Sequence, residues 1–237
     1  MRFWWGRETV RRSALACALG SAACGAEPPL RGETDIVVSL WDEAARFDSS
    51  PSYFLVEPLV EWCEQHAGSQ LLGPADPGNP SCATIDHSSD QEVIARIAQQ
   101  LERRGMERST AVEEADFVLI AGIVATSTWD LGAEFCLEDQ SPAFLAGCLR
   151  PLTDEDLQLP IGSLLLTLVD ARKTTFEEGE PLATAWMAGI DQRWHASTAL
   201  GVAGAAAQSE LLPWLDGIDR ALEQSPLFDS LAAESDR

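Results

Sequence analysis

One histidine lies in the setting that most resembles an enzyme site. His87 directly follows Asp86 and stands three residues before Asp90. A serine hydrolase needs a histidine that is oriented by a carboxylate, and a serine nucleophile that is presented on a sharp turn. The nearest candidate is Ser163, at the start of a predicted strand, but the chain contains no Gly-x-Ser-x-Gly motif. Residues 86–89 also have the pattern that precedes a capped helix. We therefore assign no catalytic residue and keep a Ser/His hydrolase as an alternative.

Two acidic clusters offer the oxygen ligands that hard cations prefer. Their members are Glu113, Glu114 and Asp116 in the first, and Asp154, Glu155 and Asp156 in the second. Neither cluster follows the ligand order of an EF-hand loop, and the three histidines form no HExxH motif. We therefore predict no metal site and no cofactor. A binder of a small molecule or a divalent cation, built on the long segment 130–160, is a second alternative.

Two tryptophans fall at the ends of predicted strands. Trp129 and Trp194 occupy these positions, whereas Trp186 and Trp214 fit core positions on a strand and a helix. Aromatic side chains that are exposed at strand ends are typical of binding surfaces. We name Trp129 and Trp194 as candidate contacts for a partner or a ligand.

The first 24 residues have the parts of an export signal. Four arginines precede a short apolar run at 13–23, which is too short to span a bilayer. The run ends in Ser-Ala-Ala-Cys, which resembles the lipobox of bacterial lipoproteins with Cys24 as the lipidated residue. That resemblance implies a membrane anchor facing the periplasm, and Gly25 is compatible with the outer membrane. An ordinary cleaved signal at 1–23 is the alternative.

Four further cysteines agree with an oxidising compartment. Cys63, Cys82, Cys136 and Cys148 form an even set, which suggests two disulfides with three possible pairings. We favour the pairing of neighbours, Cys63 with Cys82 and Cys136 with Cys148. Each bond would then staple a turn-rich segment.

Composition excludes some partners. Hydrophobic residues make up 46% of the 237-residue chain, enough to bury a core. The net charge is −22, and it becomes −25 without residues 1–23, which carry four arginines and one glutamate. Such a charge repels nucleic acid and anionic membrane surfaces. We therefore predict no nucleic-acid partner, and membrane contact only through the N-terminal lipid.

Periodicity predicts a single α+β domain at 35–228 after a tether at 24–34. Strands are predicted at 35–40, 52–56, 116–129, 163–170 and 182–194. Helices are predicted at 89–104, with a Ser89/Glu92 capping box, and at 209–224, and a helical turn at 59–64. Loop insertions are predicted at about 63–84 and 130–160, and an acidic tail at 229–237. Strand 163–170 is apolar on both faces, whereas strand 182–194 alternates and is expected to turn one face towards water. This pattern predicts two layers, a mainly antiparallel sheet with two helices packed on one face.

A family resemblance rests on several short motifs in this order. Leu101–Met106 (LERRGM) ends a helix, Ala115–Leu119 (ADFVL) opens a strand, and Leu168–Arg172 (LVDAR) ends another. The next strand carries Ala185-Trp186, and Ser225–Phe228 (SPLF) closes a final helix. With the lipobox-like Cys24, this order resembles small bacterial envelope lipoproteins of an uncharacterised domain-of-unknown-function family. The resemblance implies a non-enzymatic exported lipoprotein that binds an envelope protein or supports envelope assembly.

Overall fold

The computed structural model describes residues 36–47, 50–66, 69–72, 87–125, 128–132, 135–137, 145–153, 155, 157–160, 162–177, 179–191 and 207–235. Contacts divide the chain into Met1–Glu33 and Thr34–Arg237, and every described residue belongs to the second unit. The described helices are α1 (Asp90–Arg103), α2 (Ala207–Glu223) and α3 (Pro226–Ser235), with 3-10 turns η1 (His87–Ser89), η2 (Val112–Glu114) and η3 (Ala171–Lys173). None of the helices in these ranges has the length and apolar character needed to cross a membrane.

Strands of the main sheet are β1 (Ile36–Trp41), β2 (Ser52–Leu55), β3 (Val60–His66), β4 (Ser69–Leu72), β5 (Glu107–Arg108), β6 (Phe117–Val124), β8 (Phe135–Leu137), β9 (Gly147–Leu149), β11 (Leu164–Asp170), β12 (Pro181–Leu182) and β13 (Thr184–Asp191). A separate pair joins β7 (Thr128–Asp130) to β10 (Gln158–Pro160). The main sheet runs β1-β13-β11-β6-β3-β4-β8-β9-β12, with β2 and β5 off this path.

The centre of the sheet is antiparallel. β11 lies between β6 and β13 and pairs with both, whereas the parallel ladders contain only two or three residue pairs each. Every residue of β11 is buried. This confirms the predicted mixture of helices with a large, mostly antiparallel sheet, and the interior position predicted for 163–170.

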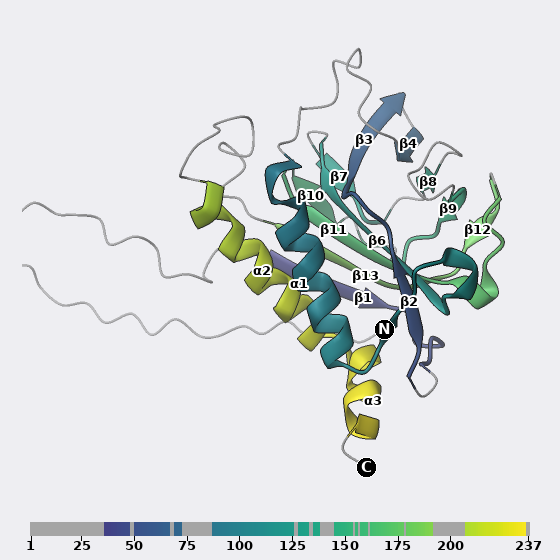
Figure 1. Ribbon diagram of the computed structural model, residues 1–237. Helices are drawn as coiled ribbons and strands as arrows, with labels where there is room; N and C mark the ends of the chain where they lie inside the picture. The colour runs from purple at the N-terminus through teal and green to yellow at the C-terminus, as the bar shows by residue number, and fades with distance from the viewer. Residues whose placement is uncertain are drawn as a thin grey trace, which may run out of the picture. The chain divides into compact units, whose positions relative to one another are not determined.

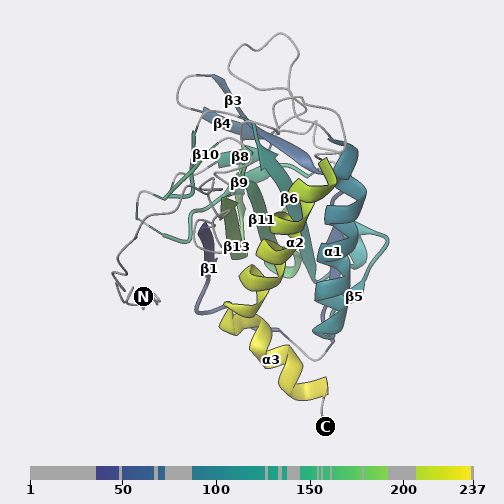
Figure 2. The same ribbon diagram turned by 90° about the vertical axis from the view of Figure 1, so that its left-hand side faces the viewer.

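The helices share one hydrophobic core, here called the helix-side core, with alternate residues of the central strands. Its strand members include Leu119, Leu166 and Trp186, and its helix members include Val93, Ile94, Ile97, Leu101, Ile218, Leu222 and Phe228. Figures 1 and 2 show α1 and α2 side by side. Arg96 of α1 pairs with Asp219 of α2, with Nε donating to Oδ1 at 2.9 Å. An apolar stripe on each helix therefore packs against the sheet, as the spacing of three and four residues predicts.

The opposite residues of the same strands form a second hydrophobic core, here called the insertion-side core. Its strand members include Val118, Ile120, Leu165 and Met187, and residues 130–160 contribute Leu131, Leu145, Leu149 and Leu159. The expectation that strand 182–194 turns one face towards water is therefore wrong, because Thr184–Ile190 is buried throughout. Where it is described, segment 130–160 also differs from the predicted loop: it forms strands and covers the sheet.

A close approach explains how the insertion packs. A Cβ atom placed on Gly189 would lie 2.7 Å from Cδ2 of Leu159, well inside van der Waals contact. Glycine at this position of β13 therefore makes room for the leucine of β10. The alternating pattern of β13 correctly predicts a strand. It does not predict that Leu159 of β10 packs against the strand face that was expected to meet water.

Several local predictions need correction. Residues 59–64, predicted as a helical turn, belong largely to β3, where Val60 and Trp62 are buried. The strand predicted at 116–129 ends at Val124, and β7 begins a separate pair. The acidic tail predicted at 229–237 is helical to Ser235, because α3 buries Leu227, Phe228 and Leu231.

Of the two predicted ends of α1, the C-terminal end at Gly105 agrees with the structure, whereas the N-terminal capping box does not. Ser89 makes no side-chain capping bond, because a 3-10 turn leads into the helix and leaves Ser89 at φ −103° and ψ 4°. At the C-terminus, Gly105 adopts φ 86°, and the N–H groups of Gly105 and Met106 donate to the carbonyls of Glu102 and Leu101. This is a Schellman ending, which requires the left-handed backbone that glycine tolerates.

Replacing Leu159 with alanine tests whether the insertion is part of the core. We expect Leu159→Ala to lower the free energy of unfolding by about 2–5 kcal/mol, because the side chain is buried and a cavity would remain. The exposed neighbour Gln158 provides a matched control, and Gln158→Ala should change stability by less than about 0.5 kcal/mol. Chemical denaturation measures both. Equal, small effects would show that the insertion does not cover the core.

Candidate functional site

The histidine singled out from the sequence bridges two carboxylates. His87 Nε2 lies 2.7 Å from Glu61 Oε1, and His87 Nδ1 lies 2.9 Å from Asp90 Oδ2. The Asp90 and Glu61 side chains are 8% and 11% exposed, whereas that of His87 is 40% exposed. The second oxygen of Glu61 is buried and has no hydrogen-bond partner in the described structure. The three side chains therefore join β3 to the beginning of α1.

This geometry does not resemble a serine hydrolase. A general base needs one ring nitrogen directed at the nucleophile, but carboxylates engage both nitrogens of His87. The Ser163 hydroxyl is buried and has no hydrogen-bond partner among the described residues. Asp86, the other carboxylate considered from the sequence, lies outside the described residues. The described contacts therefore bring together Glu61, His87 and Asp90, but not the predicted serine.

The two carboxylates control the charge of the imidazole. Burial alone would lower the pKa of His87, but hydrogen bonds and charges from Glu61 and Asp90 outweigh it and raise the pKa above its usual value. Burial also raises the pKa of Asp90, although its hydrogen bond to His87 opposes this effect. Because the folded state favours protonated His87, its contribution to stability is complete below the unfolded pKa and disappears as pH rises through the folded pKa.

A comparison of His87 variants over pH tests this linkage. We expect the wild-type protein to lose stability as pH rises from about 6 to 9, and His87→Gln to show a smaller loss over the same range. The difference should stay below about 1 kcal/mol, because a side chain this exposed is screened by solvent. Urea denaturation at fixed ionic strength measures it. A Glu61→Gln variant should also flatten the curve, and an unchanged curve in both variants would contradict the assignment.

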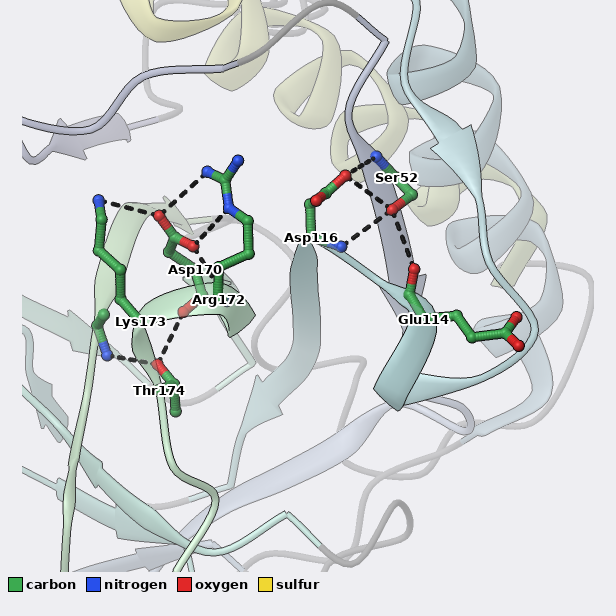
Figure 3. Close-up of polar contacts among 8 residues, drawn as sticks. Ser52, Glu114, Asp116, Asp170, Arg172, Lys173 and Thr174 are labelled. Carbon is green, nitrogen blue, oxygen red and sulfur yellow. Dashed lines mark hydrogen bonds and ion pairs between the residues drawn. The ribbon is translucent and has the colours of Figure 1, made fainter.

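A second polar group fixes β2 beside the beginning of β6 (Figure 3). The backbone N–H of Ser52 donates to Asp116 Oδ2 at 2.8 Å, and the N–H of Asp116 donates back to Ser52 Oγ at 2.9 Å. Asp116 therefore holds two strands together rather than offering a free ligand. Across the described residues, no set of three or more His, Cys, Asp or Glu side chains is arranged to hold a metal ion. Asp154 and Asp156 lie outside those residues.

A third polar group closes the turn after β11, on the left of Figure 3. Burial of Asp170 raises its pKa, but hydrogen bonds and charges from Arg172 and Lys173 outweigh this and hold the pKa below its ordinary value. The Arg172 guanidinium also lies 4.9 Å from the ring centre of Phe117. Thr174 Oγ donates to the Asp170 carbonyl at 2.8 Å and accepts from the N–H of Ala183 at 3.0 Å. These contacts stabilise the turn and leave Asp170 directed at protein groups.

Between η2 and η3, beside these two polar groups, lies a groove of about 670 Å³. Its lining consists of Phe54, Thr110, Ala111, Val112, Glu113, Ala115, Leu145, Ala171, Arg172, Thr174 and Phe176. Phe54 and Phe176 are only partly buried and pack at the edge of the insertion-side core. A concave, mainly apolar surface with a few polar groups is the usual form of a ligand site. The groove is the candidate functional site of the described domain.

Sequence reasoning did not find this groove. Its residues come from four separate places along the chain, between Phe54 and Phe176, and no motif links them. Phe54 lies in the middle of the predicted strand 52–56 and Phe176 in the connector after 163–170, so neither position signals a site. Glu113, considered earlier as a cation ligand, does line the groove.

The other predicted sites are described only in part. Cys136 and Cys148 form a disulfide that joins paired residues of β8 and β9. The proposed partner disulfide, Cys63 with Cys82, lies outside the described side chains, as do Cys24 and Trp194. Trp129 belongs to β7 and pairs in register with Leu159, but its side chain is also outside the described set. The lipidation site and the two tryptophan contacts therefore stay predictions.

Comparison with known proteins shows that the fold of this chain is similar to that of a solved structure. No protein-family model and no curated protein matches the chain. A crystal structure of a DUF4136 family protein from Bacteroides thetaiotaomicron matches with a TM-score of 0.51 and 12% sequence identity, covering 82% of this chain and 97% of that one. A PelC dodecamer from Paraburkholderia phytofirmans matches with a TM-score of 0.35 and 11% identity, covering 79% and 94%. The first match fits an uncharacterised domain family, and at this identity it concerns the fold alone.

Proposed function

We propose that this chain is an exported lipoprotein, anchored through Cys24 and facing the periplasm from the outer membrane. The sequence of residues 1–24 supports export and lipidation. The disulfide between Cys136 and Cys148 supports an oxidising compartment, where such bonds persist. The tether at 24–34 would then connect the lipid to β1, which begins at Ile36.

Replacing Cys24 tests the anchor. We expect Cys24→Ser to abolish incorporation of an alkyne-labelled palmitate and to release the protein from the membrane fraction, because the variant has no thiol to receive the lipid. Cys17→Ser keeps a cysteine change within the same segment and should retain both label and membrane association. Labelling followed by fractionation measures both. If Cys24→Ser keeps the lipid, the anchor is elsewhere.

The role of the domain is binding a partner or supporting an envelope assembly, rather than catalysis. The groove between η2 and η3 carries this proposal, because Phe54 and Phe176, which line it, are partly exposed. The polar groups offer less for catalysis: His87 is held by two carboxylates, and Asp170 by Arg172 and Lys173. These contacts disfavour a hydrolase based on His87 and Ser163.

Site-specific crosslinking in cells tests partner binding. A photoreactive phenylalanine at position 176 should give a reproducible adduct with an envelope protein, because this side chain lines the groove. The same group at Asp216, an exposed position on α2, provides the control and should not give that adduct. If position 176 yields only the products seen at 216, partner binding through the groove is excluded.

Binding of a small molecule is the second candidate function. One observation favours it: Leu145, from the segment 130–160 that was considered for ligand binding, lines the groove. The volume of about 670 Å³ also falls within the range of small-molecule sites.

We also infer a two-layer arrangement for the helical side of the domain, with α1 and α2 packed on one face of the sheet. The helix-side core supports this inference, because it combines residues of α1 and α2 with alternate residues of β6 and β11. The insertion would then form an additional cover over the opposite face.

A further inference from the structure

The groove contains one acidic group that the fold does not use. Glu113 is exposed on η2 and makes no hydrogen bond or ion pair among the described residues. Arg172, the basic group in the lining, is instead bound to the buried Asp170 carboxylate and lies over the ring of Phe117. Lys173 also pairs with Asp170, at 3.0 Å. Glu113 is therefore the charged group of the lining that no described residue pairs with.

The walls near Glu113 are apolar and aromatic. Phe54 of β2 and Phe176, which follows η3, are partly exposed, and Val112 stands beside Glu113. Aromatic faces attract cations, and they also stack with flat apolar groups. A ligand with an apolar aromatic body and one positive charge would satisfy both kinds of surface at once.

The charge of the whole chain acts in the same direction. A net charge of −22 concentrates cations near the surface and repels anions. An anionic ligand would have to share Arg172 with the Asp170 carboxylate, to which the guanidinium is already bound. A neutral apolar ligand would use the walls but leave Glu113 without a partner.

We propose that the groove between η2 and η3 binds a small organic cation with an aromatic body, with Glu113 facing the charge and Phe54 and Phe176 contacting the ring. This inference rests on the second candidate function, ligand binding, and is independent of the lipid anchor and of any protein partner.

Three indole probes that differ in charge test the ligand class. Tryptamine is a cation, tryptophol is neutral, and indole-3-propionate is an anion at neutral pH. We expect the purified full chain to bind tryptamine about threefold more tightly than tryptophol at low salt, and the anion most weakly, because an exposed ion pair contributes modestly. Titrations monitored by ligand-observed NMR give the affinities. The preference for tryptamine should diminish in 0.5 M NaCl, since salt screens exposed charges.

Two glutamates that are neighbours in sequence provide matched variants. Glu113→Gln should remove the preference for tryptamine over tryptophol, whereas Glu114→Gln, which changes an exposed residue outside the lining, should keep it. Phe176→Ala should weaken all three probes to a similar degree. Far-UV circular dichroism and the melting temperature of each variant check that the domain stays folded.

The outcomes separate the parts of the proposal. Equal binding of tryptamine and tryptophol, or equal effects of Glu113→Gln and Glu114→Gln, would overturn the cationic class while leaving the groove as an apolar ligand site. Absence of binding by all three probes, or binding that Phe176→Ala does not change, would overturn both the inference and small-molecule binding in this groove. Neither result bears on the crosslinking test of a protein partner.

Discussion

The structure depends on the burial of three central strands, β6, β11 and β13, on both faces. Leu164, Leu166 and Leu168 lie in the helix-side core, whereas Leu165 and Val169 lie in the insertion-side core. A sheet that is apolar on both faces is stable in water only if both faces are covered, since exposed leucine and valine lose the free energy gained by burial. Residues of α1, α2 and α3 share the helix-side core with these strands, and described residues of 130–160 share the insertion-side core. The helices and the described parts of the insertion therefore both keep the apolar side chains of the central strands away from water.

The polar groups are arranged around these strands. Ser52 and Asp116 join β2 to the beginning of β6, and Asp170 organises the turn that follows β11. Because β6 and β11 are antiparallel, Phe117 and Asp170 are paired in register, which brings η2 and η3 to the same end of the sheet. The groove forms between those two turns. Its position is thus a consequence of strand register, and its charge is a consequence of which carboxylates the turns already use.

Prediction succeeded where the pattern of residues reports on local structure. The stripe of Val93, Ile97 and Leu101 located α1, and Gly105 located its end. The apolar run at 163–170 indicated a strand covered on both faces. Prediction failed at 59–64, where a seven-residue strand of mixed polarity showed no clear period, and at Ser89, where His87 and Asp90 form part of a different arrangement at the helix start. It also failed at 229–237, where acidic composition concealed the buried Leu231.

The amino-acid sequence by itself determined the class of the domain, the interior position of 163–170 and the main helices, because these depend on hydrophobic period and on turn residues. It also carried the expectations of export and of lipidation at Cys24, which are properties of a linear signal. Tertiary structure alone decided that the described parts of 130–160 pack against the sheet, that His87 is held between Glu61 and Asp90, and that Phe54, Glu113 and Phe176 line one groove. Each of these features joins residues far apart in the chain, and their proximity arises from strand pairing and packing, which no local pattern encodes.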